Sequence, residues 1–507
     1  MKYIPTIGLE IHAHLKTKTK MFCDSLNDHL NAEPNTNVCA VCMGHPGVLP
    51  VANKEAINKV IQVGLALNCQ IAGESKFDRK NYFYPDLPKG YQISQYDIPF
   101  CLGGYIDIPI KSELGGEYKR IDIERIHLEE DAGRLVHSQD NTYSLVDFNR
   151  AGVPLMELVT KPVISSAFEA IKFAKELRLI LRYLGTSDAD MERGQMRVEV
   201  NLSLAPAGSK ILGTKVELKN LNSLRVVEDA TAYEINRQTR LLDSGEKIVQ
   251  ETRGWDEMRQ ETFSQRSKEE AQEYRYFPEP DLPPIIISRE HGFDLDKMKK
   301  SMVELPQAKR NRFQTEYDHA LDIVDVLIEE SDLADYFEKS VSEALSCASV
   351  NSSVGILAKK KVLTQTEEKI KILTTNYVVK NLRTLLQDTG TRVEDIKITP
   401  ENFGEFICLI HKGEINSAGA REVLEAMFNS GGGPSAIVEK KGLKQVSDED
   451  VIGKFVQEIV EANEDAVRNY KEGKEEALKF LVGQVMARSK GAANPQVAEK
   501  LLKKKLK

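Results

Sequence analysis

The stretch IGLEIHAHLKT, residues 7–17, places ionisable side chains on one face of a predicted strand. Its apolar residues alternate in period two with polar ones that include Glu10, His12 and His14, the pattern of a strand with one buried face. Glu10 and His12 are then neighbours on the polar face, about 6.6 Å apart along the strand. A carboxylate beside an imidazole can hold a metal ion or move a proton, but a solvated sheet face would have the same pattern.

Three other stretches carry carboxylates where a plain scaffold does not need them. RIHLEEDAGRLVH contains Glu129, and the functional carboxylate could instead be the next residue, Glu130. VPLMELV places Glu157 inside an apolar strand. MERGQMRVEVNLSL alternates Arg197, Glu199 and Asn201 along one strand face. Four such strands in one region favour a shared site over four separate solvated faces.

A carboxylate within an apolar strand is costly to bury unless it is paired or bound to metal. The residues predicted to converge on a cation are Glu10, His12, Glu129, Glu157 and Glu199. Oxygen-rich ligation with one imidazole suits Mg²⁺ or Mn²⁺ better than structural Zn²⁺.

The stretch FDRKNYFYPDLPKGYQISQ interleaves basic and aromatic residues around two proline-containing turns. Lys80 and Lys89 could hold phosphate while the tyrosines stack on a base. A surface loop whose aromatic rings pack on the core is the alternative. The sequence contains no P-loop or kinase-type glycine loop, so ATP would need another architecture.

Three cysteines near the N-terminus raise the question of a metal. Cys39 and Cys42 form a C-x-x-C pair, and Cys23 lies upstream across a turn-rich loop. Structural zinc takes four ligands, so a complete zinc site would need His29, Asp24 or another residue.

The elements that must position these residues change character along the chain. Up to about residue 290, strand-like runs alternate with a few helices, predicted over 54–67, 167–184 and 225–243, which indicates an α+β domain built on an antiparallel sheet. A proline-rich segment, RYFPEPDLPP, marks a boundary. We therefore predict a catalytic domain over 1–292, a helical linker domain over 293–405 and a helical tail domain over 406–507.

Bulk properties restrict the class of protein. The chain has 507 residues, 41% hydrophobic and 29% charged, as in ordinary soluble globular proteins. Its net charge of −8 argues against non-specific nucleic-acid binding over the whole surface, although eight Lys or Arg against one Glu from Lys479 onward make the tail basic. The absence of a signal peptide or membrane span, together with seven scattered cysteines, predicts a cytoplasmic protein.

These motifs together resemble the GatB family, the B subunits of tRNA-dependent aspartyl/glutamyl-tRNA amidotransferases. The resemblance spans most of residues 5–284, and VGQVMARSKGAANPQVAEKLL resembles the family's YqeY-type tail. The stretches that carry it in the first domain are GLEIHAHL, EPNTNVCAVCMGHPGVLPVANKEAI, FDRKNYFYPDLPKGYQISQ, HLEEDAGR, YSLVDFNRAGVPLMELV, GTKVELKNLNS, QETRGWD and YRYFPEPDLPP.

The resemblance implies a reaction. Such proteins use ATP and Mg²⁺ to phosphorylate the side-chain carboxylate of Glu on tRNA(Gln) or Asp on tRNA(Asn), and ammonia from an amidase subunit then displaces the phosphate. The implied partners are that amidase (A) subunit, a small C subunit and misacylated tRNA.

The resemblance also assigns roles to residues. The family's metal and activation site corresponds to Glu10, His12, Glu129 and Glu157. We add Glu199 to this site from the strand pattern alone. His14 is expected to support the ligands from behind or to lie on the surface. Lys80 and Lys89, with Glu129, resemble groups at the end of the ammonia tunnel. Ser25 stands where zinc-bearing members have a thiol, which argues against zinc at Cys23, Cys39 and Cys42.

Two other functions would use the same features. A basic helical tail alone could make the chain a tRNA-binding module or scaffold. A metal site without a need for the tail would suit a ligase or kinase that acts on a small-molecule carboxylate.

Overall fold

The computed structural model forms two compact units, Met1–Asn311 and Arg312–Lys507, each of which is described by itself. It describes residues 2–110, 118–138, 140, 142–267, 273–349, 356–445, 449–489 and 492–506. The domain boundaries expected near residues 292 and 405 stay predictions.

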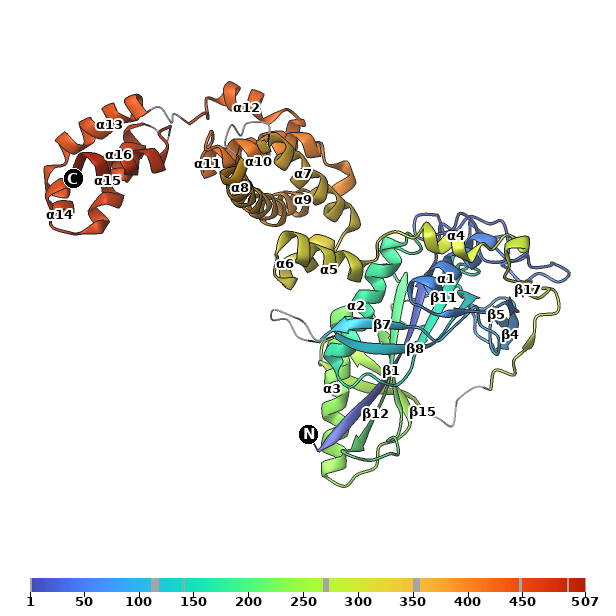
Figure 1. Cartoon of the computed structure of the whole chain (residues 1–507). Helices are drawn as coiled ribbons and strands as arrows, with labels where there is room; N and C mark the ends of the chain where they lie inside the picture. The colour runs from blue at the N-terminus through green and yellow to red at the C-terminus, as the bar shows by residue number, and fades with distance from the viewer. Residues whose placement is uncertain are drawn as a thin grey trace. The chain divides into compact units, whose positions relative to one another are not determined.

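The first unit is built on a ten-stranded sheet with β1 near its centre (Figure 1). The strands follow the order β15-β14-β13-β12-β1-β11-β8-β6-β2, and β7 also pairs with β8. Neighbours run antiparallel except for the parallel pair β13 and β14, so the predicted α+β class is confirmed for the described residues. The strands are β1 (Tyr3–His14), β2 (Gln70–Ile71), β6 (Cys101–Leu102), β7 (Tyr105–Pro109), β8 (Tyr118–Glu130), β11 (Pro154–Thr160), β12 (Met196–Pro206), β13 (Val216–Leu221), β14 (Glu251–Asp256) and β15 (Glu261–Ser267).

Helices cover the apolar face of this sheet. α1 (Lys54–Ala66), α2 (Ala167–Tyr183) and α3 (Leu224–Asp243) match the predicted helices within a residue or two. Each begins where a side chain accepts a hydrogen bond from the first turn, at Asn53, Ser166 and Ser223 respectively. α2 and α3 pack on each other and on the sheet, and their apolar faces join the strands in one core (Figure 1). The other face of the central strands is left free for a site.

The first unit also contains three small sheets, one of which contributes Lys80 and Gln92 to the candidate site. The pairs are β9 (Arg134–His137) with β10 (Ser144–Asp147) and β3 (Glu74–Ser75) with β17 (Ile285–Ile286), and the triple is β16 (Phe277–Pro278), β4 (Asp78–Asn81) and β5 (Tyr91–Ser94). Arg79 makes two 2.8 Å hydrogen bonds to the fully buried carboxylate of Glu279, which fastens the proline-rich segment to β4. This attachment holds Tyr274 and Tyr276 beside the basic and aromatic loop.

The second unit is helical in the residues described. α10 packs between α7 and α8, with Phe403 and Phe406 fully buried, and the tail helices α13 to α16 share a hydrophobic cluster of their own. No helix among the described residues of either unit has the length and apolar character needed to cross a membrane. The remaining α-helices are α4 (Leu295–Lys300), α5 (Pro306–Tyr317), which crosses the boundary between units, α6 (Leu321–Ile328), α7 (Ser331–Ser349), α8 (Ile356–Asn376), α9 (Arg383–Thr389), α10 (Pro400–His411), α11 (Ser417–Ser430), α12 (Pro434–Lys441), α13 (Glu449–Ala462), α14 (Glu464–Lys471), α15 (Glu475–Arg488) and α16 (Pro495–Leu506).

Candidate functional site

The register of the central strands brings the predicted residues to one face. His12 on β1 lies opposite Glu157 on β11 and Arg197 on β12, and Glu157 in turn lies opposite His127 on β8. Because side chains directly opposite one another share a face, neighbouring strands deliver acid and imidazole groups to the same point. This confirms the period-two reading of the strand over residues 7–17.

Two imidazoles lie among the carboxylates at the centre of this face. The Nε2 atom of His12 is 3.2 Å from Glu157, 3.7 Å from Glu129 and 3.8 Å from Glu10. The Nε2 atom of His127 is 3.3 Å from Glu157 and 3.6 Å from Glu129. Glu157 therefore bridges the two rings.

The charges of this cluster depend on one another. Although burial opposes a charged ring, the carboxylate of Glu157 beside it raises the pKa of His12 and raises that of His127 to about 9. Burial likewise opposes the ionised form of Glu157, but the two imidazolium rings hold its pKa well below the usual range. Without a metal, protonated rings thus balance ionised carboxylates.

Glu10 belongs to a second acidic group nearer the edge of the cluster. Burial, reinforced by the charge of Glu157, raises the pKa of Glu10 to about 7. Ligand atoms of Glu10, Glu199 and Glu217 lie within 4.8 Å of one another. Glu199 is paired at 2.7 Å with Lys219, so the structure places the residue expected from the strand pattern beside a cation rather than beside His12.

A cavity of about 540 Å³ opens over both acidic groups. Lys80 lines it without a carboxylate at ion-pair distance among the described residues; burial opposes its charge, yet Glu129 and neighbouring groups raise its pKa. Tyr274 covers the ammonium group of Lys80, 4.9 Å from the ring centroid. The other cations of the wall are Arg125, Arg150, Arg197 and Lys219, and Tyr82, Tyr96 and Tyr276 complete its aromatic part.

The acidic groups can hold a divalent cation. Ligand atoms of Glu10, His12 and Glu157 lie within 4.8 Å of one another, as do those of His127, Glu129 and Glu157. Carboxylate oxygens with one or two imidazoles suit a hard cation such as Mg²⁺ or Mn²⁺. A divalent ion would replace the positive charge that the two protonated rings supply.

The predicted tunnel lysines lie apart from each other. Lys80 lines the cavity, whereas Lys89 is paired with Glu130, which is buried and follows Glu129 on β8. Glu130 also accepts a 3.0 Å hydrogen bond from the backbone N–H of Ile93. Glu130 therefore belongs to a structural pair, and Glu129 is the residue of the two that faces the cavity.

The three cysteines gather as predicted, but their fourth neighbour is a cation. Ligand atoms of Cys23, Cys39 and Cys42 lie within 4.8 Å of one another. The fully buried ammonium group of Lys20 is 3.7 Å from the sulfur of Cys42. His29 lies elsewhere, against the ring of His14. Among the described residues, no fourth ligand completes a structural zinc site.

Comparison with known proteins decides the family. The model of the GatB/GatE catalytic domain matches residues 5–292, and that of the GatB domain matches residues 360–506. The chain belongs to the GatB family. It is 47% identical over 506 residues to the B subunit of the aspartyl/glutamyl-tRNA(Asn/Gln) amidotransferase of Caldanaerobacter subterraneus subsp. tengcongensis, and each chain is covered in full. The corresponding proteins of Persephonella marina and Thermodesulfovibrio yellowstonii, which have the same name, are each 46% identical, again over both full chains.

Membership of the GatB family confirms the resemblance drawn from the motifs. Sequence reasoning missed several residues of the cavity, chiefly His127, Arg125, Lys219, Tyr274 and Tyr276. For His127 a signal was present, since it stands two residues before Glu129 and shares its strand face. Tyr274 and Tyr276 gave no local signal, because the attachment of the proline-rich segment to β4 brings them to the site.

Proposed function

We propose that this chain is the B subunit of a tRNA-dependent amidotransferase. In this function it uses ATP to phosphorylate the side-chain carboxylate of misacylated Glu-tRNA(Gln) or Asp-tRNA(Asn), and ammonia from an amidase subunit then gives the amide. The observation that carries the proposal is the cavity in which a buried carboxylate–imidazole cluster faces a wall of cations. The names of the relatives support it.

The cationic wall explains how the chain's own residues would assist. A carboxylate is unreactive toward ammonia until one of its oxygens becomes a good leaving group, and phosphoryl transfer needs positioning and neutralisation of charge. Lys80, Arg125 and Arg197 present positive charge to the same cavity, where phosphate oxygens would bind. Tyr82, Tyr274 and Tyr276 form a wall on which a base or ribose can pack.

The acidic groups supply the remaining part of the activation site. Glu10, His12, Glu129 and Glu157 would hold Mg²⁺, with Glu199 next to them. The ion, when bound, neutralises charge on the transferring phosphoryl group. His12 would then be a neutral imidazole ligand, and a neutral His127 would donate a hydrogen bond to the carboxylates of Glu129 and Glu157 beside it.

The nitrogen donor must come from another chain. We propose an amidase subunit with a small C subunit as partners, and an ammonia path that ends near Lys80 and Glu129, with Lys89 beside it. Zinc is left out of this proposal because the thiols of Cys23, Cys39 and Cys42 are next to the ammonium group of Lys20 and lack a fourth ligand among the described residues.

A matched pair of variants on β8 tests the proposal. Glu129 faces the cavity, whereas Glu124 on the same strand is exposed, so Glu129→Gln and Glu124→Gln make the same chemical change in two places. In the assembled complex with misacylated tRNA and γ-labelled ATP, Glu129→Gln is expected to abolish ATP-dependent phosphorylation of the carboxylate while glutamine hydrolysis continues. Wild-type phosphorylation by Glu129→Gln, or equal loss in Glu124→Gln, would refute the assignment.

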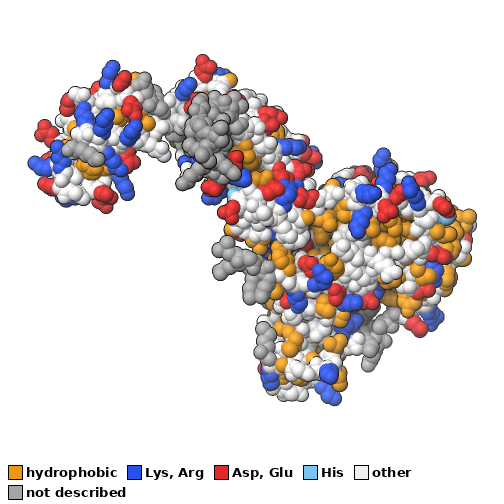
Figure 2. All heavy atoms as spheres, viewed as in Figure 1, with side chains coloured by type: hydrophobic (Ala, Val, Ile, Leu, Met, Phe, Trp, Pro, Cys, Tyr) orange, Lys and Arg blue, Asp and Glu red, His pale blue; other side chains and the backbone are white. Residues whose placement is uncertain are grey.

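The tail supports the tRNA part of the proposal. α16 carries Lys504 and Lys505 exposed on a helix whose apolar face is buried in the tail cluster, and Figure 2 shows blue Lys and Arg side chains among red Asp and Glu over these helices. A double change of Lys504 and Lys505 to Glu is expected to raise the KM for charged tRNA, more at low salt than at high salt, with the KM for ATP unchanged. An unchanged KM for tRNA would favour the small-molecule ligase or kinase instead.

A further inference from the structure

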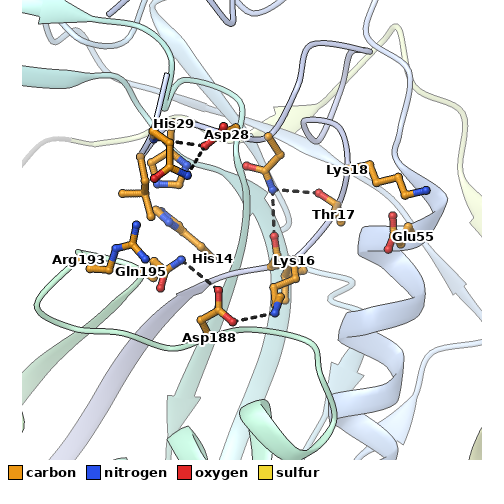
Figure 3. Close-up of a pocket in the computed structure, with 14 residues that line it drawn as sticks. His14, Lys16, Thr17, Lys18, Asp28, His29, Glu55, Asp188, Arg193 and Gln195 are labelled. Carbon is orange, nitrogen blue, oxygen red and sulfur yellow. Dashed lines mark hydrogen bonds and ion pairs between the residues drawn. The ribbon is translucent and has the colours of Figure 1, made fainter. Parts of the chain in front are cut away.

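A second cavity, of about 390 Å³, lies at the end of β1 and shares no lining residue with the first (Figure 3). His14, His29 and Gln195 are part of its wall, and a 2.8 Å ion pair between Lys16 and Asp188 closes one side. His14 is on the same face of β1 as Glu10 and His12, yet it faces this second cavity.

His14 is connected to the first cavity through one carboxylate. Only 5% of His14 is exposed, and its Nε2 atom is 2.7 Å from Oδ2 of Asp131, which is equally buried. Oδ1 of Asp131 accepts a 3.0 Å hydrogen bond from the guanidinium group of Arg197, and Arg150 is 3.4 Å from Oδ2. Asp131, Arg150 and Arg197 all line the first cavity, so they and His14 form the wall between the two.

The hydrogen-bonding roles in this wall are fixed by chemistry. The carboxylate of Asp131 faces the guanidinium groups of Arg197 and Arg150, which can only donate, so its oxygens are acceptors. His14 must therefore donate through Nε2. The Nδ1 atom of His14 has no hydrogen-bond partner among the described residues.

We propose that His14 is a positioning residue that holds Asp131, and through it the guanidinium group of Arg197, against the phosphate-binding part of the first cavity. The inference rests on the proposed function. Each oxygen of Asp131 is engaged on a different side, with Arg197 and the backbone N–H of Ala132 on Oδ1 and with His14 and Arg150 on Oδ2. When His14 no longer donates, the carboxylate can turn about the hydrogen bond from Ala132, and the orientation of the acceptor that Arg197 faces is no longer fixed.

Two amides at position 14 separate this role from simple packing. The amide nitrogen of Gln reaches about as far as Nε2 of histidine, whereas that of Asn reaches only as far as Nδ1. His14→Gln therefore keeps a donor for Asp131 and His14→Asn removes it, with both side chains neutral and polar. His29→Asn is the control, because His29 packs edge-to-face on His14, 4.9 Å between ring centroids, while Asp131 takes its imidazole hydrogen bond from His14.

The kinetic experiment measures phosphorylation of the charged amino acid by the assembled complex. We expect His14→Asn to lower kcat about 10-fold, as for loss of one hydrogen bond to a charged group, with the KM for tRNA unchanged. His14→Gln is expected to restore the rate to within about three-fold, and His29→Asn to leave it unchanged. Equal rates for His14→Asn and His14→Gln, or a loss in His29→Asn matching that in His14→Asn, would overturn the proposal.

A chemical readout keeps the inference separate from the proposed function. The side chain of Arg197 is 41% exposed, so phenylglyoxal can reach it, and mass spectrometry can locate the adduct. His14→Asn is expected to speed modification of Arg197 relative to both the wild type and His14→Gln, because the guanidinium group is no longer fixed. Unchanged modification overturns the positioning role. If the wild type phosphorylates no carboxylate but the modification rates differ as expected, the proposed function fails and the positioning role stands.

Discussion

The two faces of the central strands share one backbone but differ in role, because one face packs into the core and the other lines the candidate site. On β1, Ile7, Leu9 and Ile11 point into the core with at most 1% of their surface exposed. On the other face, Glu10 and His12 lie close to further ionisable side chains, so their charges repel like charges or need a partner of opposite charge. Apolar burial stabilises the fold, whereas Glu10, whose pKa is raised by burial, lowers stability when it is ionised. Substitutions on the two faces should therefore differ in kind.

The largest expected effect is on the site face of β11. Glu157 lies between His12 and His127, at 3.2 and 3.3 Å. Glu157→Gln removes the charge that both rings face and is expected to lower the rate of carboxylate phosphorylation about 10³-fold, toward the upper range for one preorganised electrostatic group. The melting temperature is expected to fall as well, because His12 and His127 lose the carboxylate that pairs with them, so the rate is compared per folded molecule. If Glu157→Gln unfolded the chain as well as abolishing activity, substitutions on the two faces would not differ in kind.

The next residue on the same strand points the other way. Leu158 is fully buried in the core, so Leu158→Ala is expected to lower the free energy of unfolding by about 2–5 kcal/mol through lost burial and the cavity left behind. Urea titration of the purified chain measures this change. The rate per folded molecule should remain near the wild-type rate. If Leu158→Ala lowered the rate without lowering stability, Leu158 would contribute to activity, as Glu157 is expected to do.

A smaller effect with a pH signature comes from Glu10. Since its pKa is raised to about 7 from an ordinary value of 4.5, the folded chain binds this proton more readily than the unfolded chain. The cost of the ionised carboxylate is therefore full above pH 7 and disappears as the pH falls below 4.5. Glu10→Gln is expected to stabilise the metal-free chain by about 3 kcal/mol at about pH 8 and by less than about 0.5 kcal/mol at about pH 4.5. A gain independent of pH would contradict this origin.

The smallest expected effect is at the edge of the core face. Ser166 caps α2 by accepting a hydrogen bond from the backbone N–H of Glu169 at 3.2 Å. Ser166→Ala is expected to cost about 1 kcal/mol of stability, with no change in the rate of phosphorylation. Thermal unfolding measures the loss of stability, and the kinetic assay on the same preparation measures the rate of phosphorylation.

The sequence predicted local structure better than long-range neighbours. Alternation along residues 7–17 correctly gave the faces of β1, and serine caps and a following glycine gave the ends of α2. Period two cannot say which strands become neighbours. The pairing of Glu199 with Lys219 therefore could not be predicted, because it depends on the register between β12 and β13.

The contacts of His14 were also beyond what the sequence pattern could predict. Its place on the polar face suggested a supporting or surface residue, and the structure buries it against Asp131. That contact joins residues 117 positions apart, across the end of the sheet. Similarly, Tyr274 and Tyr276 reach the cavity because Arg79 binds Glu279 and because Asn81 binds the backbone of Tyr274 and Arg275. Interactions of this kind are set by tertiary packing and leave no periodic trace in the sequence.

In the proposed function, this chain makes the carboxylate oxygen a leaving group by transferring phosphate to it. Misacylated tRNA carrying oxygen-18 in the side-chain carboxylate tests this directly in the assembled complex with ATP and glutamine. We predict that each phosphate released with amide formation contains one oxygen-18 atom from the substrate. Amide formation with phosphate that contains no oxygen-18 would contradict the account.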